Sequence, residues 1–199
     1  MQIKKILILA LFISSINSFA LASFEAEEKF VSNFADNAIS ILSNDSLDAS
    51  QKNIQFTELV MSSIDMNLIS KFVLSKYWKL ATDDQKKAYQ VAFKQYFISS
   101  YANKLDQYSG EKVVIVSSNA AKKFVIVKSN IVRDGTDTLK IELDWRLLTR
   151  DSQTKIIDLS IEGISLIIAQ REEFQSFLAN NDNSLDALIN KLNSINNKN

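Results

Sequence analysis

The sequence contains no cysteine, no histidine and no proline, and it has only three glycines, at positions 110, 135 and 163. Without cysteine no disulfide can hold the fold together, so its stability must come from packing. The lack of cysteine and histidine also excludes a Ser-His dyad, a cysteine nucleophile and the usual zinc sites. Carboxylates could still act in catalysis or bind calcium, yet the sequence has no D-x-D-x-D-G run. We therefore expect no catalytic residue, no metal and no cofactor.

The charge is balanced, with 23 Lys and Arg against 23 Asp and Glu. This balance argues against nucleic acid as a partner, because the phosphate backbone requires a basic face. The length of 199 residues and the 46% of apolar residues predict one domain with its own core. With no long exposed apolar segment after the first residues, a monomer is the expected oligomeric state.

The first 22 residues have the pattern of a secretory signal peptide. Lys4 and Lys5 form a basic start, residues 6–19 are mainly apolar, and Ala20-Leu21-Ala22 fits the small-x-small cleavage rule. The alternative is a membrane anchor, but a span needs about 20 apolar residues and this run is shorter and interrupted by serine and asparagine. We therefore expect cleavage, which leaves residues 23–199, or 199 − 22 = 177 residues, with a net charge of 21 − 23 = −2.

Residues 23–109 are predicted to form four helices. Apolar residues recur at three- and four-residue spacing over residues 24–42, 50–62 and 65–80, which is typical of one helix face. The inward-facing side chains expected in the second and third helices are Ile54, Leu59, Val60, Ile69, Phe72, Val73 and Trp78. The fourth helix begins with a capping box, Thr82 with Gln85, and ends before Gly110. Its Tyr89, Phe93, Phe97 and Tyr101 stand four residues apart and form an aromatic stripe.

After residue 110 the apolar period changes from 3.6 to 2, which predicts strands. Four strands are expected over residues 113–116, 124–132, 138–148 and 154–161, with turns at 117–122, 133–135 and 150–153. The third strand alternates apolar with charged residues, so one face is buried and the other is wet. Short loops make these strands an antiparallel meander over residues 111–162, and helical spacing returns over residues 165–194. The predicted fold class is α+β, with a curved antiparallel sheet of about four strands.

Two segments carry a family resemblance. One is D-M-N-L-I-S-K-F-V-L-S-K-Y-W over residues 65–78, and the more specific one is I-I-D-L-S-I-E-G-I-S-L over residues 156–166. With the export signal and the order of elements, they resemble the MlaC family of periplasmic phospholipid-binding proteins, also called the toluene-tolerance family. Ser75 departs from the family pattern, which often has glycine before the Tyr-Trp pair.

The resemblance implies a nuclear-transport-factor-2-like cone with a helical annex and a hydrophobic pocket that holds the acyl chains of a phospholipid. It implies a periplasmic carrier that shuttles lipid between an inner-membrane ABC transporter complex and an outer-membrane lipoprotein complex, and so maintains outer-membrane lipid asymmetry. The alternatives are a carrier of another lipid such as a hopanoid, an envelope adaptor that carries nothing, and a small-molecule enzyme on the same fold. The enzyme is disfavoured because the chain lacks histidine, the commonest acid-base residue.

Residues of the second motif have structural explanations that compete with catalysis. Glu162 before Gly163 is expected to fix a strand-to-helix corner, whose bend glycine permits. Ser165 then has the position of a helix N-cap. The segment lacks the glycines on both sides of serine that a nucleophile elbow requires.

The candidate lipid-binding residues are large apolar side chains of the third and fourth helices and the third strand: Phe72, Phe93, Phe97, Tyr101, Ile141, Leu143 and Trp145. Their alternative role is ordinary core, because stripes at helical spacing usually just pack. Arg146 and Arg171 are candidates for contacts with the lipid headgroup, since guanidinium suits phosphate. The alternative for Arg146 is plain solvation on the wet face of its strand.

Overall fold

The computed structural model describes residues 23–102, 111–133 and 140–196. The predicted signal peptide at residues 1–22 lies outside the described residues. Within them the chain forms seven helices and five strands. The elements are α1 (Glu25–Leu42), α2 (Ala49–Ser63), α3 (Met66–Leu74), α4 (Lys76–Leu80), α5 (Asp83–Ala102), β1 (Glu111–Ala121), β2 (Phe124–Arg133), β3 (Lys140–Arg150), β4 (Gln153–Ile161), β5 (Ile164–Ser165), α6 (Leu166–Ala179) and α7 (Leu185–Asn196). The predicted α+β class is confirmed.

The strands form one open antiparallel sheet in sequence order, β1-β2-β3-β4-β5. The predicted meander of four strands is confirmed, and the short β5 adds a fifth strand beside β4. The corner before β5 has the expected form, with positive φ values of 50° at Glu162 and 77° at Gly163. Ser165 caps α6 as predicted, because its Oγ accepts the Ile168 N–H at 3.1 Å.

The first strand is longer than its sequence indicates. Residues 117–121 were expected to turn, yet they continue β1 and pair with β2 up to Phe124. The register shifts between Ile115 and Ser117, which places a β-bulge at Val116. An extra residue at the bulge breaks the alternation of apolar side chains, so the periodicity ends before the strand does. The turn itself contains Lys122, with a positive φ of 60°.

The predicted third helix is two helices. α3 ends at Leu74 and α4 begins at Lys76, because Ser75 between them has φ 57° and ψ −125°. This conformation lies outside the helical region and is one that glycine adopts more easily. The apolar spacing continues across Ser75, so the sequence pattern shows no break. The capping box of the next helix is confirmed, with Gln85 N donating to Thr82 Oγ1 at 3.2 Å and Thr82 N to Gln85 Oε1 at 3.1 Å.

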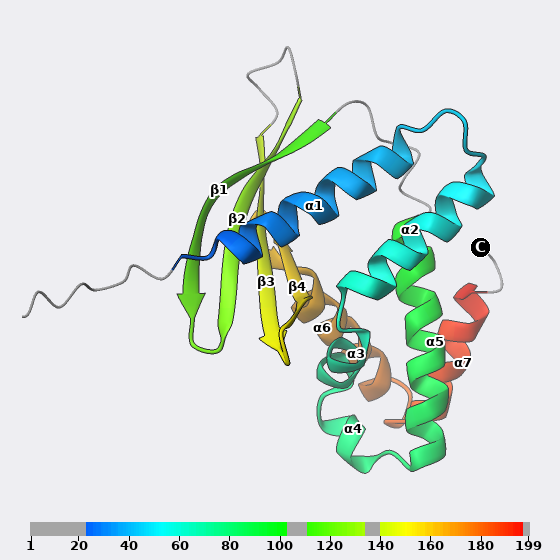
Figure 1. Ribbon diagram of the computed structural model, residues 1–199. Coiled ribbons are helices and arrows are strands. Elements are labelled where there is room, and N and C mark those ends of the chain that lie inside the picture. Colours follow the sequence, from blue (N-terminus) through cyan, green and yellow to red (C-terminus); the bar gives the residue numbers. More distant parts are fainter. Residues whose placement is uncertain (1–22, 103–110, 134–139, 197–199) are drawn as a thin grey trace, which may run out of the picture.

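The sheet stands at one side of the molecule and the bundle of helices at the other (Figure 1). α1 crosses the sheet at β1 and β2, and α2 returns beside it toward α5. α6 lies against β4 and α3, and α5 packs along α7. Among the residues the structure describes, no helix has both the length and the hydropathy needed to cross a bilayer.

Two clusters of buried side chains fill the interior. The helical core joins α2–α7 and includes Val73, Leu74, Tyr89, Phe93, Phe174, Leu178, Leu188 and Leu192. The sheet-side core joins α1 to the sheet and contains Val31, Val127, Leu143, Trp145, Leu147 and Ile156. Ile64, at the end of α2, packs against both clusters. The interior is therefore divided along a seam between the helices and the sheet.

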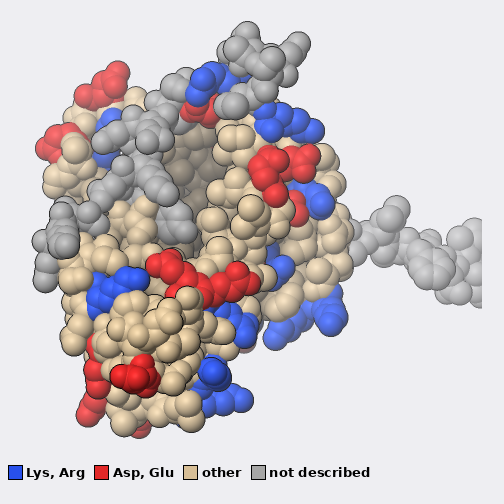
Figure 2. Space-filling view, turned by 180° about the vertical axis from the view of Figure 1, so that it is seen from behind, with Lys and Arg blue, Asp and Glu red and all other residues tan. Residues whose placement is uncertain are grey.

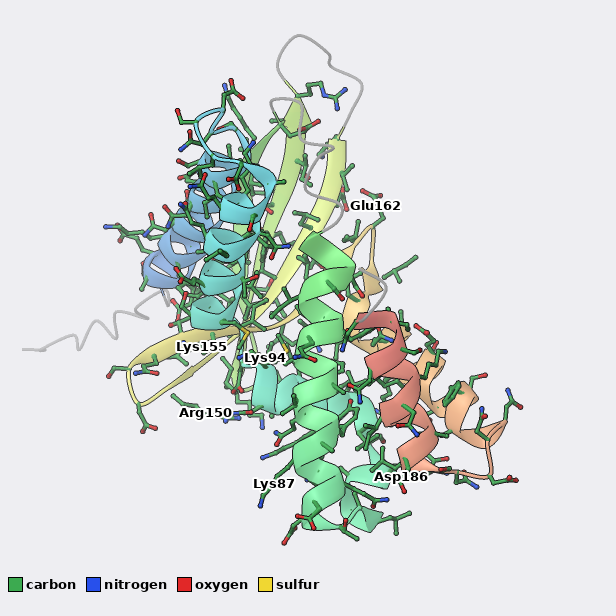
Figure 3. All side chains as sticks on the ribbon, turned by 90° about the vertical axis from the view of Figure 1, so that its right-hand side faces the viewer. Lys87, Lys94, Arg150, Lys155, Glu162 and Asp186 are labelled. Carbon is green, nitrogen blue, oxygen red and sulfur yellow. The ribbon has the colours of Figure 1, made fainter. Side chains whose placement is uncertain are left out.

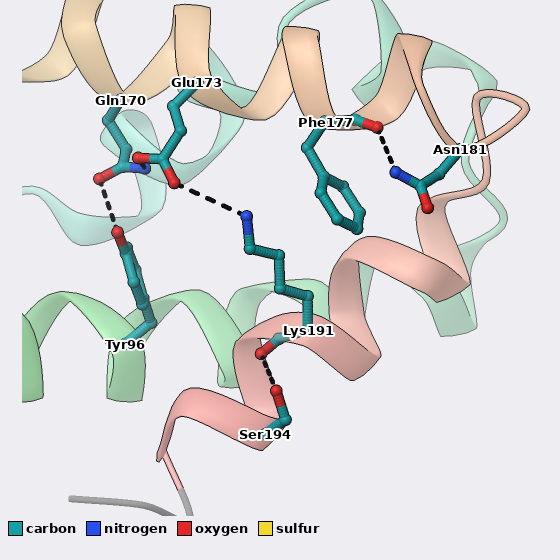
Figure 4. A network of polar contacts seen from close by, with 7 residues as sticks. All are labelled: Tyr96, Gln170, Glu173, Phe177, Asn181, Lys191 and Ser194. Carbon is teal, nitrogen blue, oxygen red and sulfur yellow. Dashed lines mark hydrogen bonds and ion pairs between the residues drawn. The ribbon is translucent and has the colours of Figure 1, made fainter.

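Polar contacts fasten the helical half from outside (Figure 4). Tyr96 Oη of α5 donates to Gln170 Oε1 of α6 at 3.2 Å. Lys191 Nζ of α7 lies 3.8 Å from Glu173 Oε1 of α6. Ion pairs of this exposed kind contribute little stability, so packing in the core carries most of it. These contacts do fix the relative positions of α5, α6 and α7.

Candidate functional site: an apolar cavity between the helices and the sheet

An apolar cavity of about 160 Å³ lies on the seam between the two cores. Its wall is formed by helices α1, α2, α3, α5 and α6 and by strands β3 and β4. The lining residues are Phe34, Phe56, Val60, Ile64, Ile69, Phe97, Ile98, Trp145, Ile156, Asp158, Leu159, Leu166 and Ile167. A cavity of similar size, ~150 Å³, with an aliphatic and aromatic lining stays dry and binds benzene. Viewed from behind, the molecular surface has a hollow, and the described residues visible inside it are uncharged (Figure 2). The cavity thus suits an apolar group and excludes a charged one.

Helical spacing places the aromatic residues of the wall. Phe34 projects from α1 and meets the Trp145 ring edge-on, with the ring centroids 5.7 Å apart. Phe56 projects from α2 toward the same space, and Phe97 projects from α5 one turn after Phe93. Trp145 is held in place from the sheet, because its Nε1 donates to Ser129 Oγ at 2.8 Å. Large side chains with fixed orientations keep this space from collapsing.

Asp158 is the polar member of the wall, and its carboxylate is already satisfied. Ser165 Oγ donates to Oδ2 at 2.7 Å, and Ile167 N donates to Oδ1 at 3.4 Å. Arg146 Nη1 lies 3.4 Å from the same Oδ2. Carboxylates are stabilised at the start of a helix, so Asp158 anchors α6 to β4 and closes one side of the cavity.

The structure places six of the seven predicted lipid-binding side chains, and two of them line the cavity. Phe97 and Trp145 line the cavity. Phe93 is fully buried in the helical core, while Leu143 is buried in the sheet-side core and Ile141 packs against it. None of these three lines the cavity. The side chain of Tyr101 lies outside the described residues.

Phe72 lies elsewhere, and the expectation that it faces inward is wrong. Its side chain is 44% exposed, and the Arg171 guanidinium stacks over its ring at 5.1 Å. Arg171 therefore contacts an aromatic ring, and Arg146 contacts Asp158. Neither guanidinium lines the cavity, and a contact of either with a headgroup stays a prediction.

The sequence pattern missed much of the wall. On α2 it pointed to Val60, which lines the cavity, and to Ile54, which is 56% exposed, but not to Phe56, which faces the cavity. Ile98 and Leu166 were also missed. One feature could have marked Phe56, since it is the only aromatic residue in residues 49–63. The position of Ile98 beside the aromatic stripe gave no such indication.

Two tyrosines of α5 have perturbed acidities. Burial raises the pKa of Tyr89 well above its ordinary value, because the phenolate would lose hydration in the helical core. Burial also raises the pKa of Tyr96, and the negative charge of Glu173 adds to that effect. Both groups are therefore neutral donors at physiological pH. Tyr89 Oη donates to the Ser70 carbonyl oxygen at 3.1 Å.

Comparison with known proteins agrees with the architecture. The family model described as MlaC protein matches residues 32–194. The intermembrane phospholipid transport system binding protein MlaC of Haemophilus influenzae is 23% identical over 132 residues, which cover 65% of this chain and 61% of that protein. The match thus spans about three fifths of the relative's length.

A solved structure is similar over nearly its whole length. It is the phospholipid-binding protein of Ralstonia solanacearum in complex with a phospholipid, with a TM-score of 0.74 and 21% sequence identity. The similarity covers 86% of this chain and 97% of that one, which shows a shared fold. Because the family model matches most of the sequence from α1 to α7, this chain belongs to the MlaC family.

Proposed function

We propose that this protein is a periplasmic carrier of phospholipid and that the cavity on the seam receives the acyl chains. The observation that supports this most is the cavity itself, whose wall is apolar apart from the paired Asp158. The same fold in the Ralstonia solanacearum protein accompanies a bound phospholipid. The transport role in the name of the Haemophilus influenzae relative points the same way.

The energetics of carriage require a deep cavity. A diacyl lipid in water exposes on the order of thirty methylenes at ~0.8 kcal/mol each, or roughly 25 kcal/mol in total. A surface groove would leave much of that cost in place, whereas an interior cavity removes both chains from water. Release into water is then too slow to be useful, so a partner must deform the cavity.

The cavity must widen to take a whole lipid. At about 160 Å³ it has the size of a site for benzene, which is far smaller than two acyl chains. We propose that the helices and the sheet separate along the seam at α1, α2 and α5, where side chains of the two cores pack around the cavity, while α6 stays anchored to β4 through Asp158. The helical core would stay intact, because its buried side chains pack against one another across α2–α7.

In this proposal the signal peptide directs the chain to the periplasm. There the carrier would pass lipid between an ABC transporter complex of the inner membrane and a lipoprotein complex of the outer membrane. Such transfer would support the lipid asymmetry of the outer membrane. Catalysis is not needed for this role, because the energy would come from the ATPase of the transporter.

The test is purification of the full chain from the periplasm without detergent, followed by native and denaturing mass spectrometry. We expect the native mass to exceed the mass of the mature chain by that of a phospholipid, which solvent extraction should recover. The mass shift also gives the number of acyl chains bound. Protein that carries no phospholipid, and takes none from phospholipid vesicles, would rule out the carrier function.

A further inference from the structure

A second recess lies beside the cavity, and it is open and charged. It has a volume of about 660 Å³ and lies between α3 and α5 on one side and the β3–β4 hairpin on the other. Three cationic side chains border it, Lys94 from α5 and Arg150 and Lys155 from the hairpin (Figure 3). We call this recess the basic groove. Lys87 lies seven residues before Lys94, so it extends the same face of α5.

The cavity and the basic groove share a wall at the junction of α2 and α3. Ile64 lines both spaces. It forms an isolated parallel bridge with Ile156 of β4, and Asp65 N donates to the Ile156 carbonyl oxygen at 3.0 Å. Ile156 faces the cavity, and Lys155 next to it faces the groove. A movement of this junction would therefore change both spaces at once.

The cations of the groove help to hold that junction in place. Lys155 Nζ donates to the Ser62 carbonyl oxygen at the end of α2. Arg150 Nη1 lies 3.9 Å from Asp65 Oδ2, and the other oxygen of Asp65 caps α3 by accepting the Leu68 N–H at 2.9 Å. Exposed contacts of this kind are weak and exchange easily. An anion that enters the groove competes for the same two cations.

We propose that the basic groove docks an acidic segment of a partner protein, and that docking loosens the wall of the lipid cavity. This inference rests on the proposed carrier function. Carboxylates of the partner would pair with Lys94, Arg150 and Lys155, which frees Ser62 and Asp65 from their present contacts. The junction at Ile64 then keeps its packing against the two cores and its backbone contacts with Ile156 but loses both side-chain ties to the hairpin, so α2 moves away from β4 more easily.

The shape and charge of the groove favour a protein segment over a membrane surface. A recess of about 660 Å³ admits a protruding loop or strand, whereas a flat bilayer would contact mainly its rim. Asp65 and Asp151 also line the groove and would repel a broad sheet of negative charge. An acidic segment can place its carboxylates at the cations and avoid these two positions.

Binding is tested with a fluorescein-labelled oligoglutamate peptide and the full mature protein, by fluorescence anisotropy. We expect Lys94→Glu and Arg150→Glu each to weaken binding by about tenfold, because each replaces an attraction with a repulsion. The matched control is Lys79→Glu, an exposed lysine of α4 outside the groove, which should bind as the native protein does. Added salt should weaken native binding. Equal binding by the groove and control variants would overturn the proposal.

Coupling is tested by the rate at which a fluorescent phospholipid moves from the protein to phosphatidylcholine vesicles. The peptide should speed this transfer for the native protein and for Lys79→Glu, and should leave it unchanged for Lys94→Glu. If the peptide binds through the groove but does not speed the transfer of phospholipid, docking does not loosen the cavity and the coupling is overturned. Groove-dependent binding to phosphatidylglycerol vesicles, with none to the peptide, would assign the groove to a membrane instead. A protein that loads no phospholipid would count against the carrier function, while the peptide comparison would still test docking.

Discussion

The helical core and the seam beside the sheet are built from the same kinds of side chain, yet only the helical core is filled. In the helical core Tyr89, Phe93 and Phe174 are fully buried, and their ring centroids lie 5.6–6.5 Å apart. At the seam Phe34, Phe56 and Phe97 surround a cavity of about 160 Å³ and remain partly exposed. The difference therefore comes from what lies opposite each ring, not from composition.

Phe93 and Phe97 show this difference within a single helix. They are four residues apart on α5, and their ring centroids are 6.1 Å apart. Phe93 meets Tyr89 and Phe174 and leaves no space, whereas Phe97 faces the cavity across from the sheet. The proposed widening would therefore displace the packing around Phe97 and leave the packing around Phe93 in place. A carrier needs both kinds of packing, because the part that stays keeps the fold while the part that moves admits the ligand.

The largest effect on stability is expected for Phe93→Ala. Removing a fully buried aromatic ring from a dense core costs about 3–5 kcal/mol in free energy of unfolding, from lost burial and the cavity left behind. Urea unfolding followed by circular dichroism measures this loss. If Phe93→Ala and Phe97→Ala lost equal stability, the two regions would not differ as described.

Phe97→Asp should affect lipid occupancy more than stability. A carboxylate in the cavity wall would have to be buried against acyl chains, and an unpaired charge is costly in such a place. We expect phospholipid to be largely absent from the purified variant, as measured by mass spectrometry after detergent-free purification. The control is Ile54→Asp, which adds the same charge at an exposed apolar position of α2. Equal loss of fold and lipid for Phe97→Asp would mean that Phe97 is ordinary core.

A smaller effect is expected for Trp145→Phe. The change removes the hydrogen bond from Nε1 to Ser129 Oγ and leaves that buried hydroxyl without its donor, which costs about 1–2 kcal/mol. A double-mutant cycle with Ser129→Ala isolates the bond, and the two losses should be far from additive. Additive losses would show that the bond does not hold Trp145 at the wall.

Tyr89→Phe should have the smallest effect, and that effect should depend on pH. At pH 7 it removes the hydrogen bond to the Ser70 carbonyl oxygen, at a cost of about 1 kcal/mol. The pKa of Tyr89 is raised in the folded state from the ordinary 10.0, so the unfolded chain loses the phenol proton first. As the pH rises above 10, the native protein should therefore lose more stability than Tyr89→Phe does. Urea unfolding midpoints of the native protein and of Tyr89→Phe, compared at neutral and at alkaline pH, measure the difference in stability between the two proteins. A difference that does not change with pH would contradict the burial of Tyr89.

Much of the fold could be predicted from local patterns. The capping box at Thr82 and Gln85, the N-cap at Ser165 and the alternation of β3 are each determined by neighbouring residues, and the structure confirms them. The break at Ser75 was missed because the apolar spacing continues across it, and the full length of β1 was missed because the bulge at Val116 interrupts the alternation of apolar residues before the strand ends.

The candidate site was predicted only in part, for a physical reason. Periodicity shows which face of an element is apolar but not what lies opposite that face. The aromatic stripe of α5 therefore placed Phe93 and Phe97 together, although one is core and the other is cavity wall. Phe56 and Ile98 join the wall only when α2, α5 and the sheet meet, which no single element reveals.

The central claim is that acyl chains occupy the seam, and photocrosslinking tests it most directly. The protein would be loaded with a phospholipid that carries a diazirine near the end of an acyl chain, irradiated and digested, and its adducts located by mass spectrometry. We predict adducts on peptides of the cavity wall, at Phe56 of α2, Phe97 and Ile98 of α5 and Leu159 of β4. Adducts confined to the basic groove or to exposed helix faces, with none on the wall, would contradict the account.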